Sequence, residues 1–600
     1  MAPKAVYDPS KGASYNPVPA DEIDALEIFP PVGIARLGDS EKEYFFAPEV
    51  PGNISPPTPD GNFRDDEQKI RRQAARFRVY AYDKKGLLLG EVNSKNEYTL
   101  TWTVHVANKK GSFIKLTGRF EQPTEDRRNP DVDPNLELGQ RSKLIVDPGE
   151  KTIVLGQGPQ NVDLIGDFYG SKSSPTKVYL GELQVDEAGR LVYLGGQGYS
   201  QCVADTGKPQ PELVSDFDST DWVDDTSDGW VSVKVTKANS FSKSSAHKAS
   251  ILSAPAKFAW GVYMPTTLYD IMEDVYDREN RLKREQKDVD VEYYTHIYPV
   301  LLSAYTLSWT HNQAFEGHGP FSKGNFLSQD LNNDLPSTSS NSLKDAVFHR
   351  LREPDYRNKD QAISVFMPRL SGDNGDMVEA GEIPEGPDPI YRFAALTKLQ
   401  YDRFKRWKDG EFIVDPPPKD LAKIEEVHLS KQPDSLTRAH LESTIGDPLF
   451  PGIEMWWLAK LTDTVGLRYA SSQINHDSGI LPGDLTRGLS LPWQADFDLC
   501  NTHWWPAVRP DIVVTKADYE EAVNATSGTD EQKFAIATTT RKNWTRGLRE
   551  TPSGESFTDM VRFWSYLGFV KRYLGPDPDH PKPPEPPVYL ESERRQLPKP

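Results

Sequence analysis

Cysteine is nearly absent from this chain. Its 600 residues contain only Cys202 and Cys500, so at most one disulfide can form and a disulfide-rich fold is excluded. The 11 histidines are scattered, with no His-Glu-x-x-His motif, and no Cys-x-x-Cys motif occurs. The sequence therefore gives no support for a zinc or iron site. His311 and His318 are interpreted as hydrogen-bonded structural residues.

The chain also lacks an excess of positive charge. It has 70 basic and 89 acidic residues, a formal net charge of -19, whereas nucleic-acid binding depends on clustered lysine and arginine. Its most basic stretch, residues 69–78, interleaves cations with apolar residues, as in a strand with one solvated face. We therefore expect no nucleic-acid partner.

Long apolar runs and nucleotide-binding motifs are missing as well. No segment approaches the roughly 20 apolar residues of a membrane span, and the first residues lack the apolar core of a signal peptide. We therefore expect a cytoplasmic protein without membrane contact. No predicted strand is followed by Gly-x-Gly-x-x-Gly, since the glycines of 195–198 and 317–319 are isolated, which argues against bound FAD.

The sequence predicts an α+β protein with three parts. Residues 1–250 read as short alternating strands separated by turns, with the clearest hairpin at 178–194, and predict an antiparallel β-sandwich-like domain. Residues 251–575 repeat apolar residues at helical spacing, for example in 391–410 and 556–574, and predict a mainly α-helical domain that carries the chemistry. Residues 576–600 contain nine prolines and predict an extended tail rather than a folded element.

Two aromatic-rich segments near the end of the chain are the candidates for chemistry. Residues 491–511 include Asp496 and Cys500, and residues 560–570 include Trp564. By composition alone, a cysteine among apolar residues is more often an inert core thiol, and a helical tryptophan is more often part of the packing. Nothing in the sequence places Cys202 beside these segments.

The chain resembles the cysteine tryptophylquinone (CTQ) amino-acid oxidases, the family of lysine epsilon-oxidase and glycine oxidase. The resemblance depends on the order of several segments along most of the chain. These are VGIARLGDS (32–40), RDDEQKIRRQAARFRVYAYD (64–83), DDTSDGWV (224–231), GDPLFPGIE (446–454), PWQADFDLC (492–500) and WSYLGFV (564–570).

This resemblance implies that the cofactor is made from the chain itself. The sulfur of Cys500 would be joined to the indole of Trp564, and that indole would be oxygenated to an ortho-quinone. Unmodified cysteine and tryptophan cannot accept two electrons reversibly, so an oxidase of this kind without flavin or metal needs such a group. The resemblance also implies a separate flavoprotein for cofactor maturation, and a homo-oligomer.

Three further residues are site candidates. Asp496 precedes Cys500 by four positions, which on a helix puts both on one face. The resemblance implies that Asp496 assists cofactor formation, and burial among aromatics would suit it as a proton acceptor; helix capping or a salt bridge is the alternative. His503 and Tyr199 are candidates for substrate contact, and a structural hydrogen bond is the alternative for each.

The implied reaction is the oxidative deamination of a primary amine. The amine condenses with the quinone, a base removes the hydrogen on the amine-bearing carbon, and O2 reoxidises the cofactor, with release of an aldehyde or oxo acid, ammonia and hydrogen peroxide. The resemblance leaves two alternatives for the amine that is oxidised. These are the side-chain amine of L-lysine and the α-amine of glycine or another amino acid. Many relatives carry a cysteine just before FPGIE that this chain lacks at 443–448.

A non-catalytic binding protein with an unmodified Cys500 is the alternative from another class. It would be colourless and would have its genetically encoded mass.

Overall fold

The fold was analysed in a computed structural model of the chain. It describes residues 2–52, 56, 58–113, 128–133, 135, 141–204, 213, 220–238, 241–281, 290–339, 341–370, 393–419, 421, 423–445, 455, 467, 479–499, 506–525, 527–529, 532, 541–549, 557–577, 582 and 584–598.

One large sheet organises the N-terminal part of the described chain. It has 14 strands, and its main path runs β8-β7-β14-β16-β3-β5-β11-β10-β9. The strands are β1 (Lys4–Ala5), β2 (Ala25–Phe29), β3 (Val32–Arg36), β4 (Glu43–Phe46), β5 (Arg72–Tyr82), β6 (Leu88–Val92), β7 (Thr99–Ala107), β8 (Lys151–Val154), β9 (Asn161–Phe168), β10 (Thr176–Val185), β11 (Leu191–Gly195), β14 (Ser227–Lys237), β15 (Phe241–Ser244) and β16 (Ala249–Ala254).

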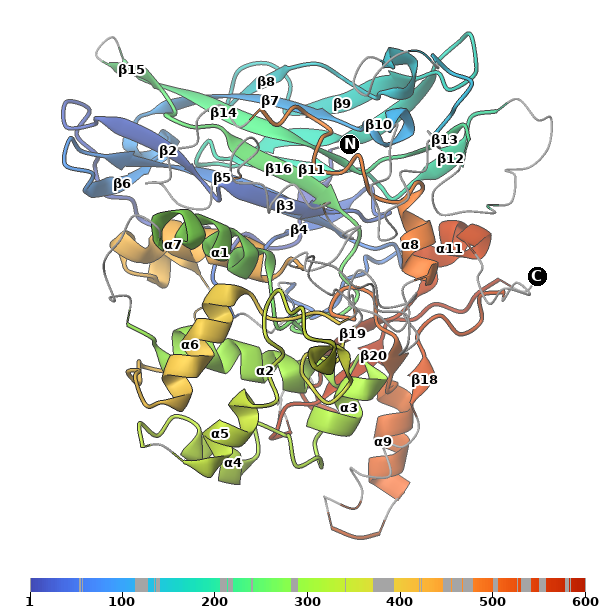
Figure 1. Cartoon of the computed structure of the whole chain (residues 1–600). Helices are drawn as coiled ribbons and strands as arrows, with labels where there is room; N and C mark the ends of the chain where they lie inside the picture. The colour runs from blue at the N-terminus through green and yellow to red at the C-terminus, as the bar shows by residue number, and fades with distance from the viewer. Residues whose placement is uncertain are drawn as a thin grey trace.

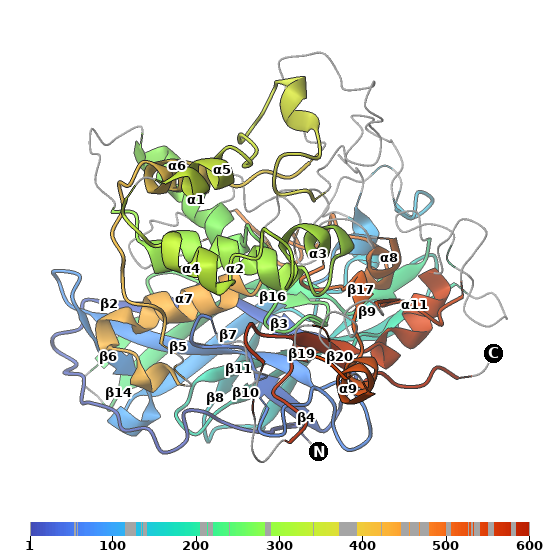
Figure 2. The same cartoon turned by 90° about the horizontal axis from the view of Figure 1, so that it is seen from below.

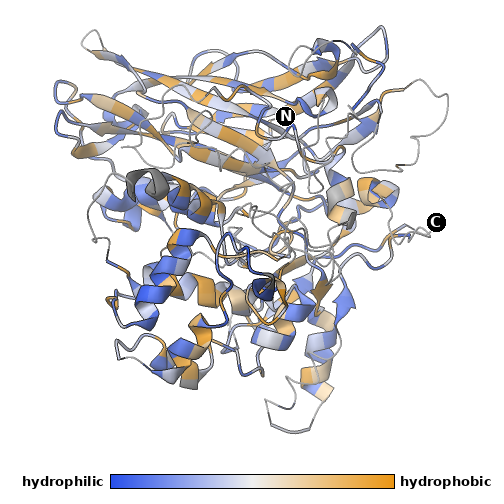
Figure 3. Ribbon diagram, viewed as in Figure 1, coloured by the Kyte–Doolittle hydropathy of each residue, from blue (hydrophilic) through white to orange (hydrophobic). Residues whose placement is uncertain are grey.

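The long strand β5 makes this sheet continuous. Its last residues pair with β2 and β6, whereas its first residues pair with β4 and β11. The sheet curls into a barrel-like layer, so that β8 and β9, from opposite ends of the path, come together. Phe77, Trp102 and Val233 belong to the core inside it, and Figure 3 shows hydrophobic residues along these strands.

The predicted N-terminal β region is therefore confirmed, but the two-sheet antiparallel sandwich is not. Among the described residues of this region, one large curled sheet lies beside the two-stranded sheet of residues 200–224. The large sheet is mixed, because β3 and β16 pair in parallel, as do β4 and β5. The predicted hairpin at 178–194 is confirmed as β10 and β11. Asp186 closes its turn by accepting hydrogen bonds from the backbone N–H groups of Ala188 and Arg190 at 2.9 and 3.0 Å.

Short helices follow the sheet in the described part of the chain. The α-helices are α1 (Leu268–Arg281), α2 (Tyr298–Leu307), α3 (Asn312–His318), α4 (Gln329–Asp334), α5 (Ser342–Phe348), α6 (Lys398–Lys408), α7 (Gln432–Glu442), α8 (Trp493–Leu499), α9 (Lys516–Ala525) and α11 (Phe557–Phe563). Figure 1 shows most of them below the sheet. The description of this part as mainly helical is not confirmed, since much of its described chain is irregular.

Strand pairs also occur in this second part. β17 (Ile512–Val513) pairs with β18 (Lys542–Asn543), and β19 (Phe569–Arg572) pairs with β20 (Tyr589–Ser592). The segment 556–574, expected to be one helix, is α11, then the 3-10 turn η9 (Trp564–Tyr566), then β19. The tail was expected not to be a folded element, but it contributes β20, with Tyr589 and Leu590 buried.

Helix α7 connects the two parts of the molecule. It lies along the sheet (Figure 2), and Nδ1 of its His440 accepts a hydrogen bond from the backbone N–H of Ile34 at 3.1 Å. The buried Arg36 on β3 donates to the carbonyls of Pro255 and Ser443 at 3.1 and 3.2 Å. The sheet therefore forms one wall against which the C-terminal segments are fixed.

Candidate functional site

Trp564 lies where α11 ends. It opens the turn η9, and its side chain is 5% exposed. The chain then passes Gly568, where a Cβ would lie 2.6 Å from the side chain of Glu591, and the Gly568 carbonyl accepts a hydrogen bond from the Trp544 indole at 2.8 Å. Only glycine fits this approach without displacement, so the turn after Trp564 is closely fixed.

Helix α8 packs directly against α11. Figures 1 and 2 show the two helices side by side at one end of the sheet. The ring of Trp493, the first residue of α8, meets the ring of Trp564 edge to face, with centroids 5.1 Å apart. Phe497, one turn further, meets Trp493 in the same way at 5.0 Å. Trp564 is therefore part of an aromatic cluster with α8.

A glycine-rich loop covers another side of Trp564. The loop joins β11 to β12 (Ser200–Cys202), and Gly198 has φ +81°. A Cβ at Gly198 would lie 2.1 Å from Cζ2 and 2.8 Å from Cη2 of Trp564. Gln494 on α8 holds this loop, because its Nε2 donates to the Gly198 carbonyl at 3.0 Å and its Oε1 accepts from the Ser200 hydroxyl at 2.7 Å.

Two adjacent carboxylates hold the segments around the ring. β12 pairs with β13 (Trp222–Asp224), which ends at Asp224. The Asp224 carboxylate accepts from the backbone N–H of Trp493 at 3.0 Å and from the ammonium of Lys110 at 2.8 Å. Asp225 accepts from the backbone N–H groups of Gln197 and Tyr199 at 2.6 and 3.1 Å. Burial raises the pKa of Asp225 to about 7.

Further residues from the sheet fix the turn after Trp564. The buried Arg64 donates to the Leu567 carbonyl at 2.9 Å. Asp39 accepts from the backbone N–H of Ile70 at 2.5 Å and has a side-chain hydrogen bond with Ser565. Segments 32–40, 64–83 and 224–231, which lie far apart in the sequence, thus meet around one tryptophan.

The structure brings together some of the predicted site residues. Tyr199 directly follows Gly198 and is 61% exposed beside the Trp564 site; partial burial raises its pKa. Asp496 lies within α8, and Cys500 directly follows the last residue of that helix. The side chain of Asp496, and Cys500 and His503 as a whole, lie outside the described residues.

Cys202 is closer to these segments than the sequence indicated. It is buried on β12 in a hydrophobic cluster with Leu491, with Ala495 of α8 and with Phe557 of α11. Burial raises the pKa of its thiol. Since β12 pairs with β13, the pairing that places Asp224 and Asp225 also places Cys202 behind α8.

Sequence reasoning assigned no role to Asp224, Asp225, Gln494 or Gly198. Each was within a segment already singled out, but their contacts depend on how β12 and β13 pair and on where α8 packs. Two consecutive aspartates between strands were the signal in the sequence that could have indicated a role. Carboxylates are rarely buried unless hydrogen bonds or cations pair with them.

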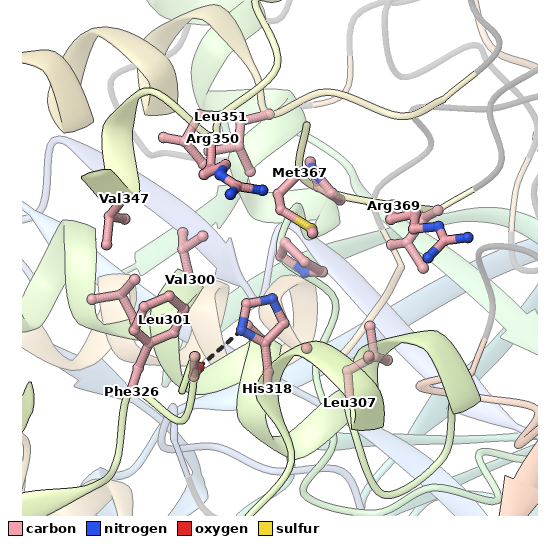
Figure 4. A pocket seen from close by; sticks show the side chains of 18 of the residues that line it. Val300, Leu301, Leu307, His318, Phe326, Val347, Arg350, Leu351, Met367 and Arg369 are labelled. Atoms are coloured by element: carbon pink, nitrogen blue, oxygen red, sulfur yellow. Dashed lines mark hydrogen bonds between the residues drawn. The ribbon is translucent and has the colours of Figure 1, made fainter. Parts of the chain in front are cut away.

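A separate cavity lies among the helices. It has a volume of about 530 Å³ between α2, α3, α5 and α6, and its mostly apolar lining includes Leu301, Phe326 and Met367 (Figure 4). His318 lies in it, with Nδ1 2.9 Å from the Gly324 carbonyl, and burial lowers the pKa of this imidazole. His311 caps α3 by accepting from the backbone N–H of Ala314. Both histidines thus have the structural roles expected of them.

Among the residues that the structure describes, no group of three or more His, Cys, Asp and Glu is arranged to hold a metal ion. Within the same residues, every helix is too short or too polar to cross a bilayer.

Comparisons with known proteins agree with this geometry. The family model described as L-Lysine epsilon oxidase N-terminal matches residues 29–252, and that of the L-lysine epsilon oxidase C-terminal domain matches residues 368–519. L-lysine 6-oxidase of Marinomonas mediterranea is 24% identical over 666 aligned positions, which cover 91% of this chain and 87% of that protein.

Solved structures show the same fold. The crystal structure of L-Lys epsilon-oxidase from Marinomonas mediterranea has a TM-score of 0.69 and 20% identity, and covers 95% of each chain. The structure of its Schiff base intermediate with L-Lys has a TM-score of 0.69 and 21% identity over the same share of both chains.

Proposed function

Since the chain belongs to the L-lysine epsilon-oxidase family, we propose that it oxidises the side-chain amine of L-lysine with O2. The products are the corresponding aldehyde, ammonia and hydrogen peroxide. The observation that carries this proposal is the convergence of three distant segments on the buried Trp564. Arg64 comes from the segment before β5, Asp225 from the turn between β13 and β14, and Trp493 from α8.

The cofactor of this proposal is a cysteine tryptophylquinone formed from Cys500 and Trp564. The site fits such a group in two respects. An ortho-quinone carries its oxygens on two adjacent ring carbons, and the residue that lies against Cζ2 and Cη2 is Gly198, so that no side chain from this position covers them. Cys500 directly follows α8, whose first residue contacts the ring. Once formed, the quinone supplies the two-electron acceptor that ordinary side chains lack.

The chain's own residues supply binding and proton transfer. Asp496 is on α8 between Trp493 and Cys500, and we assign to it the removal of the proton from the amine-bearing carbon and a role in cofactor formation. The exposed Tyr199 beside Gly198 is assigned to substrate contact, together with His503. The aromatic cluster excludes water from the ring, which protects a reactive centre.

The glycine-oxidising type is the second candidate. This chain has Ser-Thr-Ile-Gly-Asp-Pro at 443–448, where many relatives carry a cysteine, and this difference favours a pocket that is not identical to theirs. A long diamine needs a polar acceptor deep in its pocket, whereas glycine needs a short one. Peroxide release should be measured with L-lysine, glycine and other amino acids at equal concentration. The highest kcat/KM for L-lysine supports the proposal, and a preference for glycine rejects its substrate.

Maturation by a separate flavoprotein and assembly as a homo-oligomer belong to the same proposal. The intact mass of the chain should be measured after production with and without a flavoprotein partner. With the partner, the chain should gain two oxygen atoms, lose hydrogens and absorb visible light. A colourless chain with its encoded mass in both cases would favour a non-catalytic binding protein.

A further inference from the structure

The glycine-rich loop lies between Trp564 and the turn that joins β13 to β14. On the ring side, Gly198 approaches so closely that a methyl group would overlap Cζ2 and Cη2. On the other side, a Cβ at Gly196 would lie 2.5 Å from Cγ of Asp225. The backbone of the loop is therefore packed between the Asp225 carboxylate and the Trp564 ring, so a shift of the carboxylate would move the loop against the ring.

Asp225 is built into this position. It is 2% exposed, and its Oδ2 accepts two backbone hydrogen bonds, from Gln197 and Tyr199, on both sides of Gly198. Its Oδ1 has no hydrogen-bond partner within the described residues. A third backbone hydrogen bond, with Gly198, is also present. Burial of this carboxyl group costs free energy, which its contacts with the loop offset in part.

The neighbouring Asp224 holds α8, the other segment that contacts the ring. Its charge is balanced by Lys110, and it fixes the first residue of α8, Trp493. Gln494 then links α8 back to Gly198. The two carboxylates thus act on the two segments that enclose Trp564, but only Asp225 acts on the edge where Cζ2 and Cη2 lie.

We propose that Asp225 is a positioning residue for Trp564, which presses the Gly196–Tyr199 backbone against the Cζ2–Cη2 edge and so sets the place of the ring for oxygenation and for substrate. This inference rests on the proposed function. It assigns a role to a residue that does not contact the substrate. The Asp225 carboxylate holds the N–H groups of the loop, and the loop contacts the ring through the Cα of Gly198.

Asp225→Ala tests this role, with Asp225→Asn as its conservative partner. Alanine releases the loop, and a misplacement of about 1 Å at a reacting centre lowers kcat on the order of 10²-fold. We expect this loss with a smaller change in KM, incomplete quinone formation by intact mass, a shifted visible band, and faster amide hydrogen exchange in residues 195–201. The amide oxygen of asparagine still accepts both N–H groups, so Asp225→Asn should recover quinone yield and spectrum.

Asp228→Ala is the matched control. Asp228 is equally buried, and it holds the backbone of Gly483 and Thr486 instead of the loop. The Asp228→Ala variant should have a lower unfolding free energy than the parent, and it should keep the visible spectrum and kcat of the parent. Equal effects of Asp225→Ala and Asp228→Ala on quinone yield, spectrum and kcat would show a merely structural role and overturn the inference.

Gly198→Ala gives a second route if Asp225→Ala does not fold. It leaves Asp225 in place and fills the ring edge, at a φ of +81° that disfavours side chains, so the quinone yield should fall on the order of tenfold or more. A normal yield in this variant overturns the inference. Failure of the proposed function appears differently, as an unmodified mass of the parent protein itself.

Discussion

Trp564 is enclosed by residues from segments that lie far apart in the sequence. Gly198 and Trp493 meet its ring, and Arg64 and Ser565 fix the turn that follows it. The sequence identified Trp564 and Tyr199, because the order of several segments resembles a known family. It gave no role to Asp225, because that role arises only when β12 pairs with β13 and buries the carboxylate.

The thiols provide the first test at this scale. Cys500→Ala should abolish peroxide release and leave the chain colourless, because no sulfur remains to join the indole of Trp564. Cys202→Ala should keep the visible band and activity, and its unfolding free energy should decrease by about 1 kcal/mol, since a buried sulfur atom is removed. Activity in Cys500→Ala would reject the cofactor assignment.

The buried carboxyls of Asp225 and Asp228 give a pH dependence of stability. Burial raises the pKa of each from 3.8 to about 7, so between about pH 4 and pH 7 the folded chain binds more protons than the unfolded one. The favourable contribution of these two raised pKa values to the free energy of unfolding is therefore complete below about pH 4, and it is lost as the pH rises to about 7. A shift of about three units corresponds to about 4 kcal/mol per carboxyl.

Urea unfolding of the parent and of Asp228→Asn at a series of pH values measures this effect. The asparagine is neutral throughout, so the stability of the parent relative to the variant should fall as the pH rises from about 4 to about 7. A constant difference across this range would contradict the raised pKa of Asp228.

At the scale of the elements, the segment 556–574 shows what periodicity cannot predict. Its apolar residues recur at helical spacing, yet the helix ends at Phe563 and a strand begins at Phe569. The strand forms because β20 of the tail supplies its hydrogen bonds, with Phe569 opposite Ser592 and Arg572 opposite Tyr589. By contrast, 398–408 is helical as predicted, with a capping box at Thr397.

Gly568→Ala tests the junction between turn and strand. The added methyl group would lie 2.6 Å from Glu591, whose side chain is fixed by ion pairs with Arg546 and Arg594. We expect a loss of about 1 to 3 kcal/mol in unfolding free energy from overpacking, together with a lower quinone yield. Gly86→Ala, with open space around it and a positive φ, controls for backbone strain and should leave the quinone yield unchanged.

At the scale of the whole molecule, buried ion pairs join the sheet to the C-terminal part. Glu49 accepts hydrogen bonds from both Arg76 and Arg78 of β5, and Arg78 also pairs with Glu425, which precedes α7. Burial alone would raise the pKa of Glu49, but the two guanidinium groups hold it well below its usual range. The sequence predicted a strand with a solvated face here, because charge was taken as a sign of exposure.

Glu49→Gln should therefore be strongly destabilising. The substitution removes the carboxylate that two buried guanidinium groups share, although Arg76 keeps Asp8 and Arg78 keeps Glu425 as partners. Breaking a buried pair costs about 3 to 5 kcal/mol, and chemical denaturation measures the loss. Glu67→Gln, which breaks an exposed pair with Lys42, is the control and should leave the midpoint unchanged. A small effect of Glu49→Gln would show that the cluster does not hold the two parts together.

The pairing of β19 with β20 also sets the order of events in the cell. In the part of the chain that the structure describes, β19 begins five residues after Trp564, and its strand partner is Tyr589–Ser592, later in the chain. Until Tyr589–Ser592 has been synthesised, the strand that follows the turn of Trp564 has no partner. An oxygenating enzyme would therefore meet a fixed indole only after that later segment has paired with β19.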